Sequence, residues 1–90
     1  MTIQEVKQLD KNSYQIIDIR DENEIAHGAI PGAVAMKAEE IAESPLLDKN
    51  KKLVICCSRG KYSQEVAPGL IEKGFDAVSL KGGYIAWLMD

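Results

Sequence analysis

A chain of 90 residues is long enough for one small domain and leaves no room for a second. Hydrophobic residues make up 46% and charged residues 28%, which excludes a disordered chain. The net charge of -3 does not indicate nucleic acid as a partner, and no apolar run approaches the ~20 residues of a membrane span. We therefore expect one domain over residues 1–90, with no nucleic acid and no membrane as partner. Because the first 20 residues lack the layout of a signal peptide, the expected location is cytoplasmic.

The first half of the chain is expected to alternate between helices and short extended segments. Thr2 and Glu5 form a capping-box pattern, which opens a helix with an apolar face of Ile3, Val6 and Leu9. The elements that follow are, in order, a strand over Tyr14–Ile19, a short acidic helical turn over Asp21–Ala26, a loop over Gly28–Gly32, an extended segment over Ala33–Met36 and a helix over Ala38–Glu43.

The second half repeats this alternation. Its expected elements are a strand over Leu53–Cys56, a polar loop over Ser58–Tyr62, a helix capped by Ser63 that runs to about Lys73, a strand over Ala77–Leu80 and a final helix after Gly82 and Gly83. Pro68 lies inside one of these helices, where it usually costs ~3 kcal/mol, and it predicts a kink. The order of strands and helices predicts an α/β fold with a mainly parallel sheet.

The two cysteines, Cys56 and Cys57, are adjacent in sequence. Neighbouring residues on a strand point to opposite faces, so a disulfide between them would be strained. Two ligands are too few for a structural zinc site, and the one histidine, His27, is distant in sequence. We therefore expect no metal and no cofactor, and one of the two cysteines is a candidate reactive thiol.

Cys57 is the better candidate, because it lies where an apolar strand ends and a helix is about to begin. Open α/β sheets place ligand sites at such ends, and the N–H groups of the loop and helix can converge on an anion. Arg59 and Lys61 add positive charge, and Gly60 permits a conformation that a side chain would forbid. Lowering a thiol pKa by two units needs ~2.7 kcal/mol, which several N–H donors and two cations can supply. The alternative is a small buried hydrophobe, the interpretation we prefer for Cys56.

Three blocks of sequence resemble a known family, the single-domain rhodanese. They are D-I-R-D-E-N-E at Asp18–Glu24 followed by G-A-I-P-G-A at Gly28–Ala33, then C-S-R-G-K-Y-S at Cys57–Ser63, and finally G-G-Y-I-A-W at Gly82–Trp87. They occur in family order and at family spacing over essentially the whole chain. The resemblance implies a three-layer fold with a central, mainly parallel sheet of about five strands flanked by helices.

The resemblance also implies a thiosulfate sulfurtransferase with Cys57 as the nucleophile. The thiolate would take sulfur from thiosulfate or a similar small anionic donor, and the persulfide would pass it to cyanide or another thiophilic acceptor. A sulfur-relay protein is a further candidate partner. The residues expected to bind substrate are Ser58, Arg59, Gly60, Lys61, Tyr62 and Ser63.

Several positions depart from the family pattern and leave the donor open. Ala29 stands where histidine is usual, and Ala35 stands where a polar residue is frequent. Ser58 and Tyr62 stand where basic residues are common.

The sequence can also be compared with what other functions would require. A cysteine phosphatase needs arginine six positions after the cysteine, whereas that position holds Ser63 counted from Cys57 and Tyr62 counted from Cys56. A non-catalytic interaction module and a protein-to-protein persulfide carrier stay open as alternatives. Among the other residues, Asp18 and Arg20 are expected to pair, His27 to be exposed, Trp87 to lie in the core, and Tyr84 either to line the pocket mouth or to pack.

Overall fold

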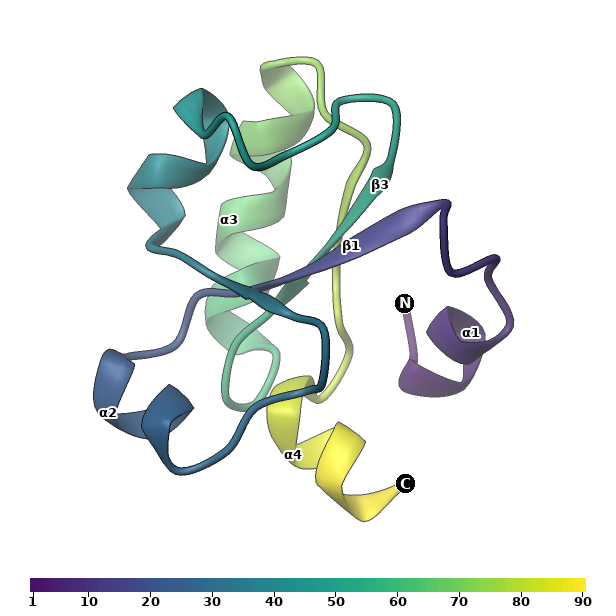
Figure 1. Cartoon of the computed structure of the whole chain (residues 1–90), viewed down its shortest axis with the longest axis vertical. Coiled ribbons are helices and arrows are strands. Elements are labelled where there is room, and N and C mark those ends of the chain that lie inside the picture. Colours follow the sequence, from purple (N-terminus) through teal and green to yellow (C-terminus); the bar gives the residue numbers. More distant parts are fainter.

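The computed structural model describes residues 1–90 as a sheet of four parallel strands with helices on both faces (Figure 1). The strands lie in the order β2-β1-β3-β4. Their bounds are Tyr14–Asp18 for β1, Val34–Ala35 for β2, Lys52–Cys56 for β3 and Ala77–Ser79 for β4. Every pairing in the sheet is parallel, so the expected α/β fold is confirmed.

The sheet has four strands, where about five were expected. At the outer edge of β4, the amino group of Met1 donates to the Ser79 carbonyl at 3.0 Å, and the Lys81 N–H donates to the Met1 carbonyl at 2.7 Å. Thr2 then caps α1 (Ile3–Lys7) through the expected capping box. Only one residue therefore lies along this edge, which is too few for a strand.

The helices make the sheet the middle layer of three. α1 and α4 (Gly83–Met89) pack on one face, while α3 (Lys61–Glu72) and the 3-10 helix η1 (Ala38–Glu43) pack on the other. α2 (Glu22–Ala26) follows the carboxyl end of β1, as Figure 1 shows. The carboxyl ends of the strands therefore meet α2, the start of α3 and the start of α4 at one edge of the molecule.

Each strand contributes side chains alternately to the two faces. The buried strand residues on the α3 face are Ile17, Leu53, Ile55 and Ala77, and those on the α1 and α4 face are Ile16, Val54 and Cys56. β3 is paired on both sides and covered on both faces, so it needs apolar side chains throughout. This burial explains the uninterrupted apolar run that the sequence shows there.

The helix after the cysteine loop begins earlier than predicted. α3 begins at Lys61 with Gly60 as its N-cap, so the expected cap at Ser63 is wrong. Gly60 has a φ of 90°, a left-handed conformation that glycine adopts readily, and it turns the chain directly into the helix. Ser63 is therefore the third residue of α3, and it is completely buried.

The ends of the other helical segments lie close to the predicted positions. α3 continues through Pro68 and ends at Glu72. η1 has the predicted bounds, with 3-10 rather than α geometry. None of the helices combines the length and apolar character that crossing a membrane requires.

Candidate active site

Cys57 lies directly after β3, at the carboxyl edge of the sheet. Cys57 is only 5% exposed, and it belongs to the core cluster on the α3 face. Cys56 belongs to the cluster on the opposite face, and both cysteines are free thiols. The pair is therefore divided by the sheet, as the alternation of strand side chains predicted.

Two N–H donors and one hydroxyl group, to which the neutral thiol donates, surround the sulfur atom of Cys57. The N–H groups of Gly60 and Ser63 lie 3.1 and 3.3 Å from Sγ, and the Ser63 hydroxyl oxygen lies 3.4 Å from it. The early start of α3 brings these groups together, because the first turn of the helix directs its free N–H groups back toward the strand end. The loop therefore forms a small cradle for negative charge on sulfur.

The pKa of Cys57 reflects two opposing effects. Burial raises the pKa of the thiol, but hydrogen bonds from the Ser63 side chain and from the backbone of Ser63, Gly60 and Arg59 outweigh it, so the pKa lies below its ordinary value. These hydrogen bonds stabilise the thiolate, which is the nucleophilic form of cysteine. The charges of Arg59 and Lys61 were expected to contribute to the lowered pKa. Both side chains are exposed, so solvent screens their charges.

Cys56 has the opposite chemistry. Burial, followed by the negative charge of Asp18, raises the pKa of Cys56 to about 12. Its Sγ donates to the Cys57 carbonyl at 3.5 Å. Cys56 is therefore protonated and unreactive at neutral pH, in agreement with the structural interpretation of this residue.

The carbonyl groups of the loop are held away from the sulfur by the start of α4. The N–H of Tyr84 donates to the Cys57 carbonyl at 2.8 Å, and the N–H of Ile85 donates to the Ser58 carbonyl at 3.1 Å. These bonds satisfy free donors of the α4 N-terminus and at the same time fix the orientation of the loop. The N–H groups on the inner side of the loop can then face Cys57.

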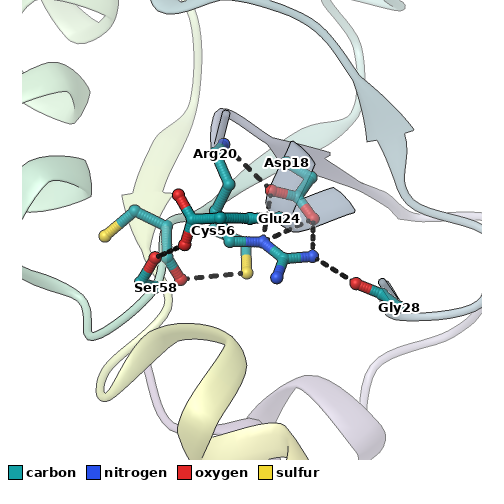
Figure 2. Close-up of polar contacts among 7 residues, drawn as sticks. Asp18, Arg20, Glu24, Gly28, Cys56 and Ser58 are labelled. Atoms are coloured by element: carbon teal, nitrogen blue, oxygen red, sulfur yellow. Dashed lines mark hydrogen bonds and ion pairs between the residues drawn. The ribbon is translucent and has the colours of Figure 1, made fainter. Parts of the chain in front are cut away.

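A buried ion pair supports the loop from the side of β1. The Arg20 guanidinium donates to both carboxylate oxygens of Asp18, at 2.8 to 3.1 Å, and to the Gly28 carbonyl at 2.7 Å (Figure 2). It also stacks 3.8 Å from the centre of the Tyr84 ring. The expected pairing of Asp18 with Arg20 is confirmed, and the pair connects β1, the loop before β2 and α4.

A pocket of about 380 Å³ opens above Cys57. Ser58, Arg59, Lys61 and Tyr62 line it on the side of the cysteine loop. The other lining residues come from the loop between β1 and α2 and from α2 itself, and they are Ile19, Arg20, Asp21 and Glu24. The side chains of Arg59 and Lys61 form no ion pair, so their charges are available to an anion that enters the pocket.

The structure thus brings the residues predicted from the cysteine loop together around Cys57. Gly60 and Ser63 contact the sulfur, and the other four line the pocket. Sequence reasoning did not identify Glu24, although it ends the first motif block. Its carboxylate accepts a hydrogen bond of 2.7 Å from the Ser58 hydroxyl, as Figure 2 shows. Ser79 was missed as well: its hydroxyl lies 2.5 Å from that of Ser63.

Three aromatic or titratable residues lie outside the pocket. His27 ends α2, is exposed and contacts the Asn23 carbonyl through Nδ1 at 2.7 Å. Tyr84 packs against Trp87, with ring centres 5.8 Å apart, so it supports the site and does not line its mouth. Trp87 is half-buried against the core cluster of the α1 and α4 face.

Comparison with known proteins agrees with this geometry. Residues 2–90 match the family described as the rhodanese-like domain. The chain is 42% identical over 84 residues to the thiosulfate sulfurtransferase GlpE of Shewanella oneidensis, covering 91% of this chain and 83% of that protein. It is 39% identical over 87 residues to GlpE of Pseudoalteromonas translucida, covering 93% of this chain and 82% of that protein.

A solved structure shows the same fold. The rhodanese-like domain protein from Staphylococcus aureus is 34% identical and superposes with a TM-score of 0.83, covering 97% of this chain and 88% of the other. The family match extends over residues 2–90, which include the cysteine loop and the residues that support it. The two GlpE relatives are named thiosulfate sulfurtransferases, and the chain itself belongs to the rhodanese-like domain family.

Proposed function

We propose that this chain transfers sulfane sulfur from thiosulfate, or a similar small anionic donor, to a thiophilic acceptor through a persulfide on Cys57. The observation that carries the proposal is the cradle at Sγ, where the N–H groups of Gly60 and Ser63 lie 3.1 and 3.3 Å away. The names of the relatives support a sulfurtransferase, and two of them carry thiosulfate in their names.

In the first half-reaction, the Cys57 thiolate attacks the outer sulfur of thiosulfate. A new S–S bond forms to Cys57, the S–S bond of thiosulfate breaks, and sulfite leaves with the electron pair. The persulfide carries a negative charge on its outer sulfur, as the thiolate did. The outer sulfur lies about 2 Å beyond Sγ, and the loop N–H groups that surround Sγ are the donors nearest to its charge.

In the second half-reaction, the acceptor attacks the outer sulfur of the persulfide. With cyanide the product is thiocyanate, and with a thiolate the product is a new persulfide. The Cys57 thiolate is the leaving group in either case, and the pKa lowered by Ser63 and Gly60 makes it a better one. The same hydrogen bonds therefore serve both half-reactions.

One side of the pocket is suited to binding a small anion. Arg59 and Lys61 line it beside Cys57 without ion-pair partners. Ser63 occupies the position where a phosphatase needs its phosphate-gripping arginine, which argues against phosphate monoesters as substrates. A non-catalytic interaction module would make no use of a stabilised thiolate.

The proposal predicts one added sulfur atom on Cys57 after treatment with thiosulfate. Intact-mass and peptide mass spectrometry should locate the sulfur, and Cys57→Ser should abolish both the added mass and the formation of thiocyanate from cyanide. Cys56→Ala is the matched control, because that thiol is protonated, and it should keep both. Persistent transfer by Cys57→Ser would refute the assignment.

A second prediction concerns the positive side of the pocket. Because Arg59 is exposed, its charge acts through solvent, and Arg59→Ala should raise the KM for thiosulfate by about two- to fivefold. Loading by a neutral organic trisulfide should change much less. Lys73→Ala, which removes an exposed cation outside the pocket, is the control. Equal effects of the two variants on thiosulfate loading would argue against a donor-binding role for Arg59.

A further inference from the structure

A second hollow adjoins the pocket above Cys57. It has a volume of about 450 Å³ and lies between α2 and η1. The two hollows share the lining residues Ile19, Arg20, Asp21 and Tyr62, so they lie side by side. We call the hollow between α2 and η1 the side groove. Cys57, Arg59 and Lys61 line the first pocket and not the side groove.

The side groove combines an apolar lining with acidic residues. Its apolar side chains are Ile19, Ile25, Ala35, Met36 and Ala38. Its carboxylates are Asp21, Glu22, Glu39 and Glu40, and none of them is in an ion pair. Arg20 is already paired with Asp18, which leaves Lys37 as the one cation free to offset these four charges. The side groove is therefore strongly negative.

Such a surface repels thiosulfate and sulfite, so it does not serve the donor. The donor already has two free cations, Arg59 and Lys61, in the pocket that contains Cys57, where they offset Asp21 and Glu24. An acceptor arrives after sulfite has left and does not need the two cations. The side groove offers it an acidic approach next to the pocket that contains Cys57.

We infer that the side groove binds the sulfur acceptor, and that this acceptor is a cysteine within a basic polypeptide segment; the inference rests on the proposed function. Lysine and arginine combine apolar stems with cationic heads, which matches an apolar lining with carboxylates around it. A groove of about 450 Å³ is far larger than cyanide or a single thiol needs, and it accommodates the residues on either side of a cysteine.

The transfer step follows directly from this placement. The acceptor cysteine loses its proton to solvent, and its thiolate attacks the outer sulfur of the Cys57 persulfide. One S–S bond forms on the acceptor while the bond to Cys57 breaks and returns its electron pair to the Cys57 thiolate. No oxidant or reductant is needed.

The test separates the two half-reactions. The protein is loaded with thiosulfate and freed of excess donor, and the loss of the added sulfur is followed by intact mass in a single turnover. The acceptors are end-blocked pentapeptides with a central cysteine, one flanked by lysines and one by glutamates. Cyanide serves as an acceptor that needs no groove.

Two double variants with equal charge change are compared with the wild-type protein. Glu22→Gln with Glu39→Gln removes two carboxylates from the side groove and leaves the Glu40 cap of η1 intact. Glu65→Gln with Glu72→Gln removes two exposed carboxylates from α3, outside every hollow. The rate ratio of the lysine peptide to the glutamate peptide is measured for each protein, so intrinsic differences between the two thiols cancel.

We expect this ratio to fall by about three- to tenfold in the groove variant, as for loss of two partly exposed charge contacts, and to stay unchanged in the α3 variant. The fall should shrink at high salt, because the Debye length at 0.15 M is only about 8 Å. An equal ratio in all three proteins, or equal falls in both variants, would overturn the inference. So would cysteamine, a small cationic thiol, reacting as fast as the lysine peptide with the same dependence on the groove.

The experiment also distinguishes this inference from the proposed function. If thiosulfate never adds sulfur to Cys57, the proposed function fails. If the sulfur is added and cyanide removes it, but the peptides show no dependence on the groove carboxylates, only the present inference fails.

Discussion

The Ser63 hydroxyl contacts both the reactive sulfur and two other polar groups of the site. Its hydroxyl lies 3.4 Å from Sγ, 3.2 Å from the Gly60 carbonyl and 2.5 Å from the hydroxyl of Ser79. The Ser63 hydroxyl has one proton, which it donates either to the Gly60 carbonyl or, when Cys57 is ionised, to the sulfur; in the second case Ser79 can donate to the Ser63 oxygen. Ser79 is then a positioning residue that acts through Ser63.

Ser63→Ala should therefore raise the pKa of Cys57. Because hydrogen bonding lowers the pKa, wild-type alkylation by iodoacetamide should reach half its maximal rate below the ~8.5 of a free thiol, and the variant's midpoint should move upward. Ser79→Ala should move it in the same direction by a smaller amount. A midpoint that does not move in Ser63→Ala would contradict the role of the hydroxyl.

The same lowered pKa links the thiolate to stability. A thiol whose pKa is lower in the folded state than in the unfolded chain contributes stability above the unfolded value. That contribution is lost as the pH falls through the folded pKa. Cys56, with its pKa raised to about 12, is protonated in both states at neutral pH; above the unfolded value it lowers stability, because only the unfolded thiol then ionises.

At the scale of elements, the cysteine loop and the start of α4 fit together through glycines. Gly83 has a φ of 60°, and a Cβ at this position would lie 2.3 Å from the Cys57 carbonyl oxygen and 2.8 Å from the Gly60 nitrogen. Gly60 in turn approaches Gly82 so closely that a Cβ on Gly60 would lie 2.8 Å from the Gly82 nitrogen. The terminal G-G motif therefore leaves the space that the cysteine loop needs to pack against α4.

Gly83→Ala should abolish most of the sulfur-transfer activity while the protein still folds. The added methyl group displaces the loop, so the N–H donors leave Sγ and the alkylation midpoint of Cys57 moves toward that of a free thiol. Gly74→Ala is the matched control. It also has a positive φ, 94°, but its Cβ would meet nothing within 4 Å. It should cost about 1–2 kcal/mol of stability and leave the midpoint unchanged. Equal activity in the two variants would refute this account.

The sequence was sufficient where local patterns decide the structure. The four strands lie within one or two residues of the predicted ranges, because apolar runs between polar turns mark them clearly. The N-cap of α3 was mispredicted, because a serine is a common cap; the conformational freedom of Gly60 was expected, but not that its turn would start the helix there. The roles of Glu24 and Ser79 depend on contacts across 34 and 16 residues, which one sequence does not reveal.

At the scale of the whole molecule, the buried pair of Asp18 and Arg20 connects segments that are distant in the chain. The side chains are 1% and 4% exposed, and Arg20 also contacts Gly28 and the ring of Tyr84. Such a pair needs all its partners, because removing one leaves a buried charge uncompensated. The D-I-R motif is therefore a structural connection between β1, the loop before β2 and α4.

Arg20→Met should lower the free energy of unfolding by about 3–5 kcal/mol, because the Asp18 carboxylate stays buried without its partner. Urea denaturation measures the loss. Combining it with Asp18→Asn should cost less than the sum of the two single changes, since the pair acts as a unit. Lys52→Met, which breaks the more exposed pair with Asp76, should cost at most about 1 kcal/mol. A loss of similar size in Lys52→Met and Arg20→Met would contradict the distinction.

The separation of the two cysteines by the sheet also determines how the protein recovers from oxidation. A sulfenic acid on Cys57 is usually rescued when a nearby thiol condenses with it. Cys56 cannot provide that thiol, because it lies in the cluster on the opposite face and is protonated. Repair therefore depends on a thiol from another molecule, and without one peroxide drives Cys57 onward to its irreversible sulfinic form.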